Sequence, residues 1–176
     1  MLRSSFRPLA LLGALLCALP ASAQLGASVY VQTTGEVVAR FEGHTAGYSS
    51  ALFLDQALIG PIFPNQTTPV GTTFSLGTFA AGTELIFRLH VYNTGDNWYT
   101  GPAGRNADGF AHANVVYNWN GTGRTFVGFE DLFNLGDRDY DDHMFSFTNV
   151  STVQVPAPAA LLPFAAGLLR LRMRRR

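Results

Sequence analysis

The nine residues from Glu84 to Tyr92 constrain the fold more than any other stretch of the chain. Four apolar side chains recur at every second position and share one side: Leu85, Phe87, Leu89 and Val91. The residues between them, Ile86, Arg88, His90 and Tyr92, share the other side. A period of two residues is that of a β-strand with one face in the core. The pattern therefore predicts a half-buried strand.

Further short runs of β-branched and aromatic residues are bounded by Gly, Asn, Asp or Pro, and no stretch sustains the 3.6-residue period of a helix. The further predicted strands are Ser28–Val31, Glu36–Phe41, Ala51–Leu54, Thr72–Phe79, Ala113–Trp119, Thr125–Phe129 and Met144–Val150. Eight short strands predict an all-β fold, an antiparallel β-sandwich or jelly roll. We expect long loops at Gly60–Gly71 and Thr94–Phe110.

The first 23 residues are typical of a secretion signal. Arg3 and Arg7 precede an apolar run from Leu9 to Leu19, which is too short for a stable membrane span. Pro20 follows, and Ala21-Ser22-Ala23 has the small residues that signal peptidase requires. We expect a signal helix and cleavage before Gln24; the alternative is an uncleaved N-terminal anchor.

The other end of the chain carries two prolines, a short apolar run and a basic block. Val155-Pro156-Ala157-Pro158-Ala159 precedes the apolar residues 160–169, and five of the last seven residues are arginines. A basic terminus stays on the cytoplasmic side of a membrane during export. The order resembles the PEP-CTERM sorting signal in its Val-Pro-x-Pro-Ala form. The resemblance implies a short hydrophobic helix, transient inner-membrane anchoring and processing by an exosortase-type protease. A plain C-terminal anchor and a peripheral amphipathic tail are the alternatives.

Between these ends lies one domain, residues 24–154, whose charge differs from that of the whole chain. The two ends hold seven of the 12 basic residues, so five arginines face all 12 acidic residues, a formal charge of −7. Such a surface repels phosphate backbones, which argues against nucleic acid as a partner. The only cysteine, Cys17, lies in the signal segment, so the domain has no disulfide and no thiol nucleophile.

Half of the acidic residues fall within 13 positions, from Glu130 to Asp142. Asp137, Asp139 and Asp141 alternate as the first ligands of many Ca²⁺ loops do, and carboxylate oxygens suit Ca²⁺ better than zinc. Further candidate ligands are Glu130, Asp131 and Asp142. An EF-hand is excluded, because its sixth and twelfth positions would be Asp142 and Thr148. The alternative is a solvated acidic turn in which Arg138 pairs locally.

The same residues carry a second resemblance. Phe-Glu-Asp-Leu at 129–132, Gly-Asp-Arg-Asp-Tyr at 136–140, and the aromatic strand that follows resemble the core motif of the DUF4114 family, with Asp141 where that family usually has Asn. Phe110-Ala111-His112-Ala113 is also similar to that family. In all, the resemblance covers about residues 82–150. It implies a β-rich extracellular domain and no particular reaction.

Catalytic motifs are lacking. The four histidines do not have zinc-protease spacing, and there is no Gly-x-Ser-x-Gly elbow. We expect His90 and His112 to be satisfied strand residues, whereas His143, which is adjacent to the acidic loop, could cap it or pair with it. Trp98 and Tyr99 could form a sugar-stacking platform, or pack in the core.

We therefore expect a non-enzymatic, exported bacterial protein with a structural or adhesive role at the cell surface or in the extracellular exopolysaccharide matrix. Ca²⁺ would hold its acidic loop. The alternative is a carbohydrate-binding module that uses loop aromatics, and a glycoside hydrolase is a third possibility. Exposed, coplanar Trp98 and Tyr99 would favour sugar binding, whereas burial would favour the structural role.

Overall fold

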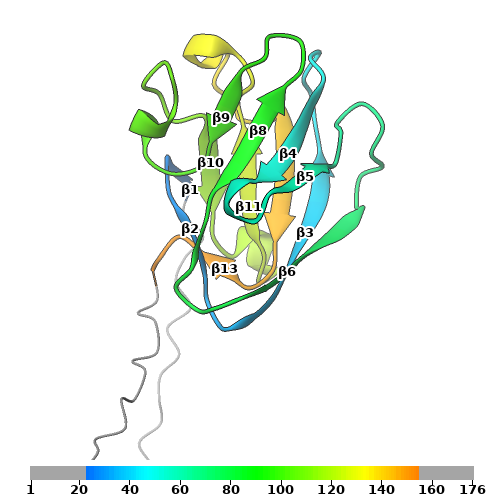
Figure 1. The fold of residues 1–176 in the computed structure, drawn as a ribbon. Coiled ribbons are helices and arrows are strands. Elements are labelled where there is room, and N and C mark those ends of the chain that lie inside the picture. Colours follow the sequence, from blue (N-terminus) through cyan, green and yellow to red (C-terminus); the bar gives the residue numbers. More distant parts are fainter. Residues whose placement is uncertain (1–22, 155–176) are drawn as a thin grey trace, which may run out of the picture.

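The computed structural model describes residues 23–154, and this part of the chain is all-β (Figure 1). It contains thirteen strands and four short 3₁₀ turns, without an α-helix. The strands are β1 (Ala23–Leu25), β2 (Val29–Val31), β3 (Gly35–Gly43), β4 (Ser50–Leu54), β5 (Ile59–Ile62), β6 (Thr73–Phe79), β7 (Glu84–Leu85), β8 (Phe87–Val91), β9 (Asn97–Tyr99), β10 (Ala113–Val116), β11 (Thr125–Phe129), β12 (His143–Phe147) and β13 (Val150–Ser151). The 3₁₀ turns are η1 (Asp55–Ala57), η2 (Ala103–Arg105), η3 (Trp119–Gly121) and η4 (Phe133–Leu135). The predicted all-β class is confirmed.

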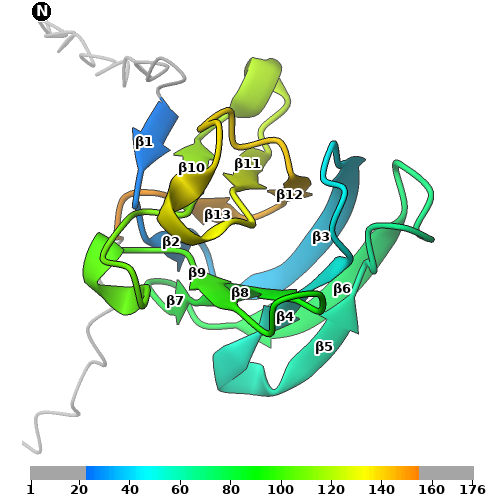
Figure 2. The same ribbon diagram turned by 90° about the horizontal axis from the view of Figure 1, so that it is seen from above.

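The strands form three sheets in which every pairing is antiparallel. The largest has the order β1-β10-β11-β12-β3-β6, the second β5-β4-β8-β9, and the smallest β13-β2-β7. Figure 2 shows β10, β11 and β12 on one side of the molecule and β4, β8 and β9 on the other.

Aromatic side chains from the two larger sheets meet in one core. Phe87 of β8 stacks on Phe147 of β12 with 4.2 Å between ring centroids. Phe63, just after β5, packs on Phe41 of β3 and Phe145 of β12, at 6.0 and 6.1 Å. These rings bury large apolar areas in a domain without disulfides.

The alternation at Glu84–Tyr92 gives the burial that it predicts, but the stretch forms two strands. Leu85, Phe87, Leu89 and Val91 are fully buried. Glu84 and Leu85 pair with β2, while the residues from Phe87 on pair with β4, so the segment passes from one sheet to another. Met144–Val150 is likewise divided between β12 and β13, at a turn where Asn149 has a φ of 57°.

Both predicted loops contain a short strand that their glycine content concealed. Ile59–Ile62 pairs with β4, and Asn97–Tyr99 pairs with β8. Gly95, with a φ of 80°, forms the tight turn between β8 and β9. The 94–110 segment is therefore partly a hairpin. Ala113–Trp119, by contrast, ends as a strand at Val116.

The predicted signal helix and sorting tail lie outside the described residues, apart from Ala23. The predicted cleavage point after Ala23 falls inside β1, where Gln24 and Leu25 pair with Val115 and Asn114. Within residues 23–154 no helix has the length and apolarity needed to cross a membrane.

Candidate functional site

The acidic loop joins the end of β11 to the start of β12 and folds back over β11. The carbonyl oxygen of Tyr140 lies so close to Gly128 that a Cβ there would come within 2.0 Å of it. Only glycine permits this approach of backbone to backbone. Gly128 therefore determines the path of the loop over the strand.

The loop is tightly coiled, with several residues in the left-handed region. Asn134, Leu135, Arg138 and Tyr140 have φ values of 58–73°, and Gly136 has a φ of 47°. Such backbone is costly for residues with a Cβ, so contacts elsewhere must hold it. One such contact is made by Tyr140, whose buried ring reaches back to donate a hydrogen bond to the carbonyl of Ala111, at 3.2 Å.

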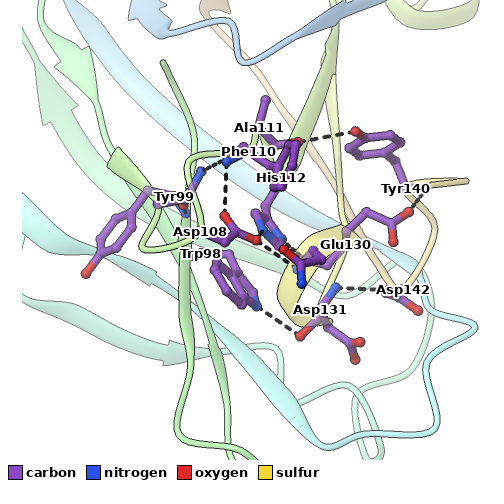
Figure 3. A network of polar contacts seen from close by, with 12 residues as sticks. Trp98, Tyr99, Asp108, Phe110, Ala111, His112, Glu130, Asp131, Tyr140 and Asp142 are labelled. Carbon is purple, nitrogen blue, oxygen red and sulfur yellow. Dashed lines mark hydrogen bonds and ion pairs between the residues drawn. The ribbon is translucent and has the colours of Figure 1, made fainter. Parts of the chain in front are cut away.

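A buried polar network fixes the end of β11 (Figure 3). The His112 ring is fully buried, and its Nδ1 lies 3.0 Å from the carbonyl oxygen of Glu130. Its Nε2 lies 2.8 Å from Oδ2 of Asp108, which is also buried. Both ring nitrogens thus face acceptors, so His112, which directly precedes β10 and is not itself a strand residue, is held within the fold and is not a free ligand.

Asp108 is a carboxylate held by several donors. Burial alone would raise its pKa, but hydrogen bonds from the Phe110 N–H, from His112 and from the Asn134 N–H lower the pKa below its usual value. The bond to Asn134 ties the acidic loop to the segment before β10. Nothing in the sequence marks Asp108 for this role.

Trp98 belongs to the same network. Its indole is 1% exposed, lies parallel to the His112 ring with 3.7 Å between centroids, and donates from Nε1 to the carbonyl oxygen of Asp131 at 2.9 Å. Of the two roles that the sequence allowed, Trp98 therefore packs in the core, and its ring has no free face for sugar stacking. Tyr99 points the other way and lines a separate cavity of about 240 Å³ with Asp55, Ile86 and Arg105.

Anchored in this way, the end of β11 places Glu130 beside two aspartates of the loop. One carboxylate oxygen from each of Glu130, Asp137 and Asp139 lies within 4.8 Å of the others. A Ca²⁺ ion binds oxygens at about 2.3–2.6 Å, so two of its ligands are at most about 5 Å apart. The three carboxylates thus have the spacing of one Ca²⁺ site, and we name them the carboxylate cluster.

Glu130 is the unusual member of the carboxylate cluster, because it is fully buried. Its Oε1 accepts a hydrogen bond from the Tyr140 N–H at 2.6 Å, whereas its Oε2 has no partner. A buried carboxylate oxygen without a donor is expensive. Burial is the main cause that raises the pKa of Glu130, and the charges of Asp142 and Asp137 add to it.

Gly136 leaves space beside that oxygen. A Cβ at Gly136 would lie 3.3 Å from Glu130 Oε2 and 3.1 Å from a methyl carbon of Leu132. Arg138, which could have neutralised the carboxylates, is exposed and makes no ion pair within residues 23–154. The local pairing expected of a solvated turn is therefore not found at Arg138.

The other predicted ligands have separate contacts. Asp141 accepts a hydrogen bond from the Thr45 hydroxyl, and its carbonyl accepts one from the Thr45 N–H at 3.0 Å. This pair fastens the loop to the segment after β3. Of the alternating aspartates, the structure thus groups Asp137 and Asp139 with Glu130, and leaves Asp141 out.

Asp131 and Asp142 form a second acidic pair. The Asp131 N–H donates to Asp142 Oδ2 at 2.9 Å, and the buried Asp131 carboxyl group is also hydrogen-bonded to the Asp142 side chain. Burial, followed by the charge of Asp142, raises the pKa of Asp131 to about 7. Both residues line a cavity of about 230 Å³ together with Gly47, Tyr48 and Leu132.

His143 turns into the core and away from the carboxylates, so it does not make the pairing with the acidic loop that its position in the sequence allowed. It is fully buried, its Nδ1 lies 2.8 Å from the Ser50 hydroxyl, and its ring packs on Phe41 and Phe145. Burial lowers the pKa of His143 to about 3. A neutral, enclosed imidazole of this kind supports the fold and does not serve the loop.

No protein-family model matches this chain, and the searches of curated proteins and of solved structures found nothing significantly similar to it.

Proposed function

We propose that this protein is an exported, non-enzymatic component of a bacterial cell surface or extracellular matrix, in which one Ca²⁺ ion holds the acidic loop closed. The observation that carries the calcium site is the buried Glu130 carboxylate, which has one oxygen without a partner and lies in one group with Asp137 and Asp139. A hard cation would supply the partner that Glu130 lacks and offset the repulsion among the carboxylates.

The three carboxylates of the carboxylate cluster are too few to fill the coordination shell of a Ca²⁺ ion. Ca²⁺ takes six to eight oxygens, so water or backbone carbonyls would complete the shell of the carboxylate cluster. Because Asp137 and Asp139 are exposed, we expect a weak site with a Kd of about 10⁻⁴–10⁻³ M, which is sufficient outside cells. Asp141 and Asp142 would act as supports of the loop.

We propose that the two larger sheets form a β-sandwich of the jelly-roll type, and that the resemblances to PEP-CTERM tails and to the DUF4114 motif reflect a surface protein. Exopolysaccharide and the processing proteases would be its partners. The burial of Trp98 supports a structural role over the carbohydrate-binding alternative, which requires exposed rings.

Calorimetric titration of the full-length protein with Ca²⁺ tests the site. We expect one binding event, weakened about tenfold or more in Glu130→Gln, because the amide loses the charge and keeps the hydrogen bond to Tyr140. The matched control is Glu36→Gln, since Glu36 is exposed and lies at the opposite end of β3 from Thr45. Equal affinities of wild type and Glu130→Gln would refute the site.

Mass spectrometry and cell fractionation test export. The mature protein should begin at Gln24, and deletion of residues 156–176 should release a folded, soluble domain into the medium, because those residues supply the membrane halt and not the fold. Intact Met1 in the envelope would contradict cleavage. A truncated chain that fails to fold would mean that the tail belongs to the domain.

A further inference from the structure

Asp108 lies in the segment before β10 and is linked to both parts of the chain that supply the carboxylate cluster. Its side chain is 1% exposed. One of its oxygens, Oδ2, lies 2.8 Å from Nε2 of His112 and accepts a hydrogen bond from the Asn134 N–H at 2.9 Å. The other oxygen, Oδ1, accepts a hydrogen bond from the Phe110 N–H at 3.0 Å. Asp108 thus holds three neighbouring groups without belonging to the carboxylate cluster itself.

The first link runs through His112 to Glu130 (Figure 3). The Glu130 N–H donates to the His112 carbonyl oxygen at 2.9 Å, and Nδ1 of the His112 ring lies 3.0 Å from the Glu130 carbonyl oxygen. His112 therefore holds both backbone groups of the residue whose carboxylate enters the cluster. The Trp98 indole stacks on the His112 ring, with 3.7 Å between centroids, and fixes the plane of the ring. Within that plane, the acceptor at Asp108 decides which edge of the ring faces Glu130.

The second link runs to the acidic loop through Asn134, which lies three residues before Asp137. Asn134 and Leu135 have φ values of 64° and 73°, and Gly136 follows with a φ of 47°. Left-handed backbone is costly for residues with a Cβ, so the turn needs outside contacts to persist. The hydrogen bond from the Asn134 N–H to Asp108 is such a contact. It therefore helps to hold the turn that leads directly to Asp137.

A carboxylate cluster that is already held in the binding arrangement binds a metal ion more tightly, because less of the chain must be ordered on binding. Groups that contact the ligands from outside commonly change metal affinity by about 10- to 100-fold. Asp108 reaches Glu130 on one side and the turn before Asp137 on the other. Its loss would therefore loosen both parts of the carboxylate cluster together.

We propose that Asp108 is a positioning residue of the calcium site: through His112 and Asn134 it keeps Glu130 and the two aspartates of the cluster at the spacing that one cation requires. Asp108 does not bind the cation itself. The proposal rests on the proposed calcium site and adds to it the group that sets its affinity. A merely structural residue would lower the stability of the fold and leave the Ca²⁺ affinity unchanged, whereas a positioning residue lowers both.

Asp108→Asn tests the proposal, because the amide has the shape of the carboxylate but one acceptor atom in place of two. At least one of the three contacts of Asp108 then loses its acceptor. We expect the Kd for Ca²⁺, measured by NMR titration of the full-length protein, to rise about tenfold. Urea unfolding in chelator checks that the variant folds and measures its loss of stability.

Thr125→Val is the matched control. The buried Thr125 hydroxyl, at the start of β11, donates to the Val150 carbonyl oxygen at 2.6 Å, so this variant also loses a buried hydrogen bond. Thr125 lies at the end of β11 remote from Glu130. We expect the stability to fall while the Kd for Ca²⁺ keeps its wild-type value. A Kd that rises equally in Thr125→Val and Asp108→Asn would overturn the proposal, because affinity would then follow stability alone.

Hydrogen exchange in chelator gives a second readout that needs no bound Ca²⁺. The Tyr140 N–H donates to Glu130 Oε1, so its exchange reports whether Glu130 is held in place. We expect this amide to exchange about tenfold faster in Asp108→Asn than in Thr125→Val, since only the first variant releases Glu130. Equal exchange rates of the Tyr140 amide in the two variants would overturn the positioning role.

The outcomes also separate the positioning role from the calcium site. Ca²⁺ binding by the wild type with an equal Kd in folded Asp108→Asn would refute the positioning role and leave the calcium site standing. No Ca²⁺ binding by the wild type would refute the calcium site and the positioning role with it. A raised Kd together with faster Tyr140 exchange, in Asp108→Asn and not in Thr125→Val, would support both.

Discussion

At the scale of single residues, the acidic loop contains a buried carboxyl group whose ionisation makes the stability of the protein depend on pH. The pKa of Asp131 in the folded protein is about 7, against an ordinary value of 3.8. The folded state therefore holds a proton between these values that the unfolded chain has lost, and stability falls as the pH rises through this window. Above pH 7 the penalty is fully present. The sign is opposite to that of a salt-bridged aspartate.

Asp131→Asn should remove this dependence. We expect the free energy of unfolding, measured with urea in the presence of a chelator, to fall less steeply between pH 4 and pH 7 in the variant. The difference in slope is at most ~1.4 kcal/mol per pH unit, the value for one proton. Since His143 acts in the opposite direction below pH 6.5, only the difference between variant and wild type is informative. Parallel slopes would mean that Asp131 is ionised throughout.

The residues also show where sequence reasoning ends. Spacing alone suggested Asp137, Asp139 and Asp141 as ligands, but left-handed residues coil the loop and bring Glu130 to the first two. Asp108 escaped notice because it lies in a glycine-rich segment, and its burial depends on His112. The carboxylate cluster and the Asp108–His112 contact both depend on how the loop folds, and the residue types alone do not reveal that fold.

At the scale of elements, strands with alternating polarity were predictable and those that depend on a partner were not. Thr125–Phe129 was predicted with its observed ends, because the segment is rich in aromatic and β-branched residues. As β11 it pairs with β10 on one side and with β12 on the other. β5 and β9 were missed, since three or four residues among glycines carry little periodicity and form strands only beside β4 and β8. For β9, the turn residue Gly95 was the one signal in the sequence that could have indicated a hairpin with β8.

The element that most tightly constrains the site is the crossing of the loop over Gly128. Gly128→Ala should destabilise the protein by about 3 kcal/mol, the upper end of the usual cost of overpacking, because its Cβ would collide with the Tyr140 carbonyl. Ca²⁺ binding should weaken too, since the loop that carries Asp137 and Asp139 would move. Urea unfolding of the variant measures the loss.

Gly104→Ala is the control for that substitution, because a Cβ there has no atom within 4 Å and the φ is not positive. We expect the free energy of unfolding of Gly104→Ala to lie within about 0.5 kcal/mol of that of the wild type. A Gly128→Ala protein as stable as the Gly104→Ala control would show that the loop does not cross the strand as described.

At the scale of the whole molecule, the domain carries excess negative charge and has no cysteine to form a disulfide. A ligand that binds only the folded state stabilises it, by about 1.4 kcal/mol at ten times its Kd. For a domain of this size that corresponds to a rise in Tm on the order of 5 °C. The charge balance of the mature domain could be read from the sequence, whereas the closure of the loop by Glu130 needed the structure.

The most direct test is the Tm of the full-length protein, measured in chelator and in about 10 mM Ca²⁺, ten times the weakest Kd expected for such a site. We predict a rise of several degrees in the wild type and in Asp141→Asn, because Asp141 is bonded to Thr45 and lies outside the carboxylate cluster. Glu130→Gln and Asp137→Asn should lose the response. A Tm that does not change with Ca²⁺, or a response lost in Asp141→Asn and kept in Glu130→Gln, would contradict the account.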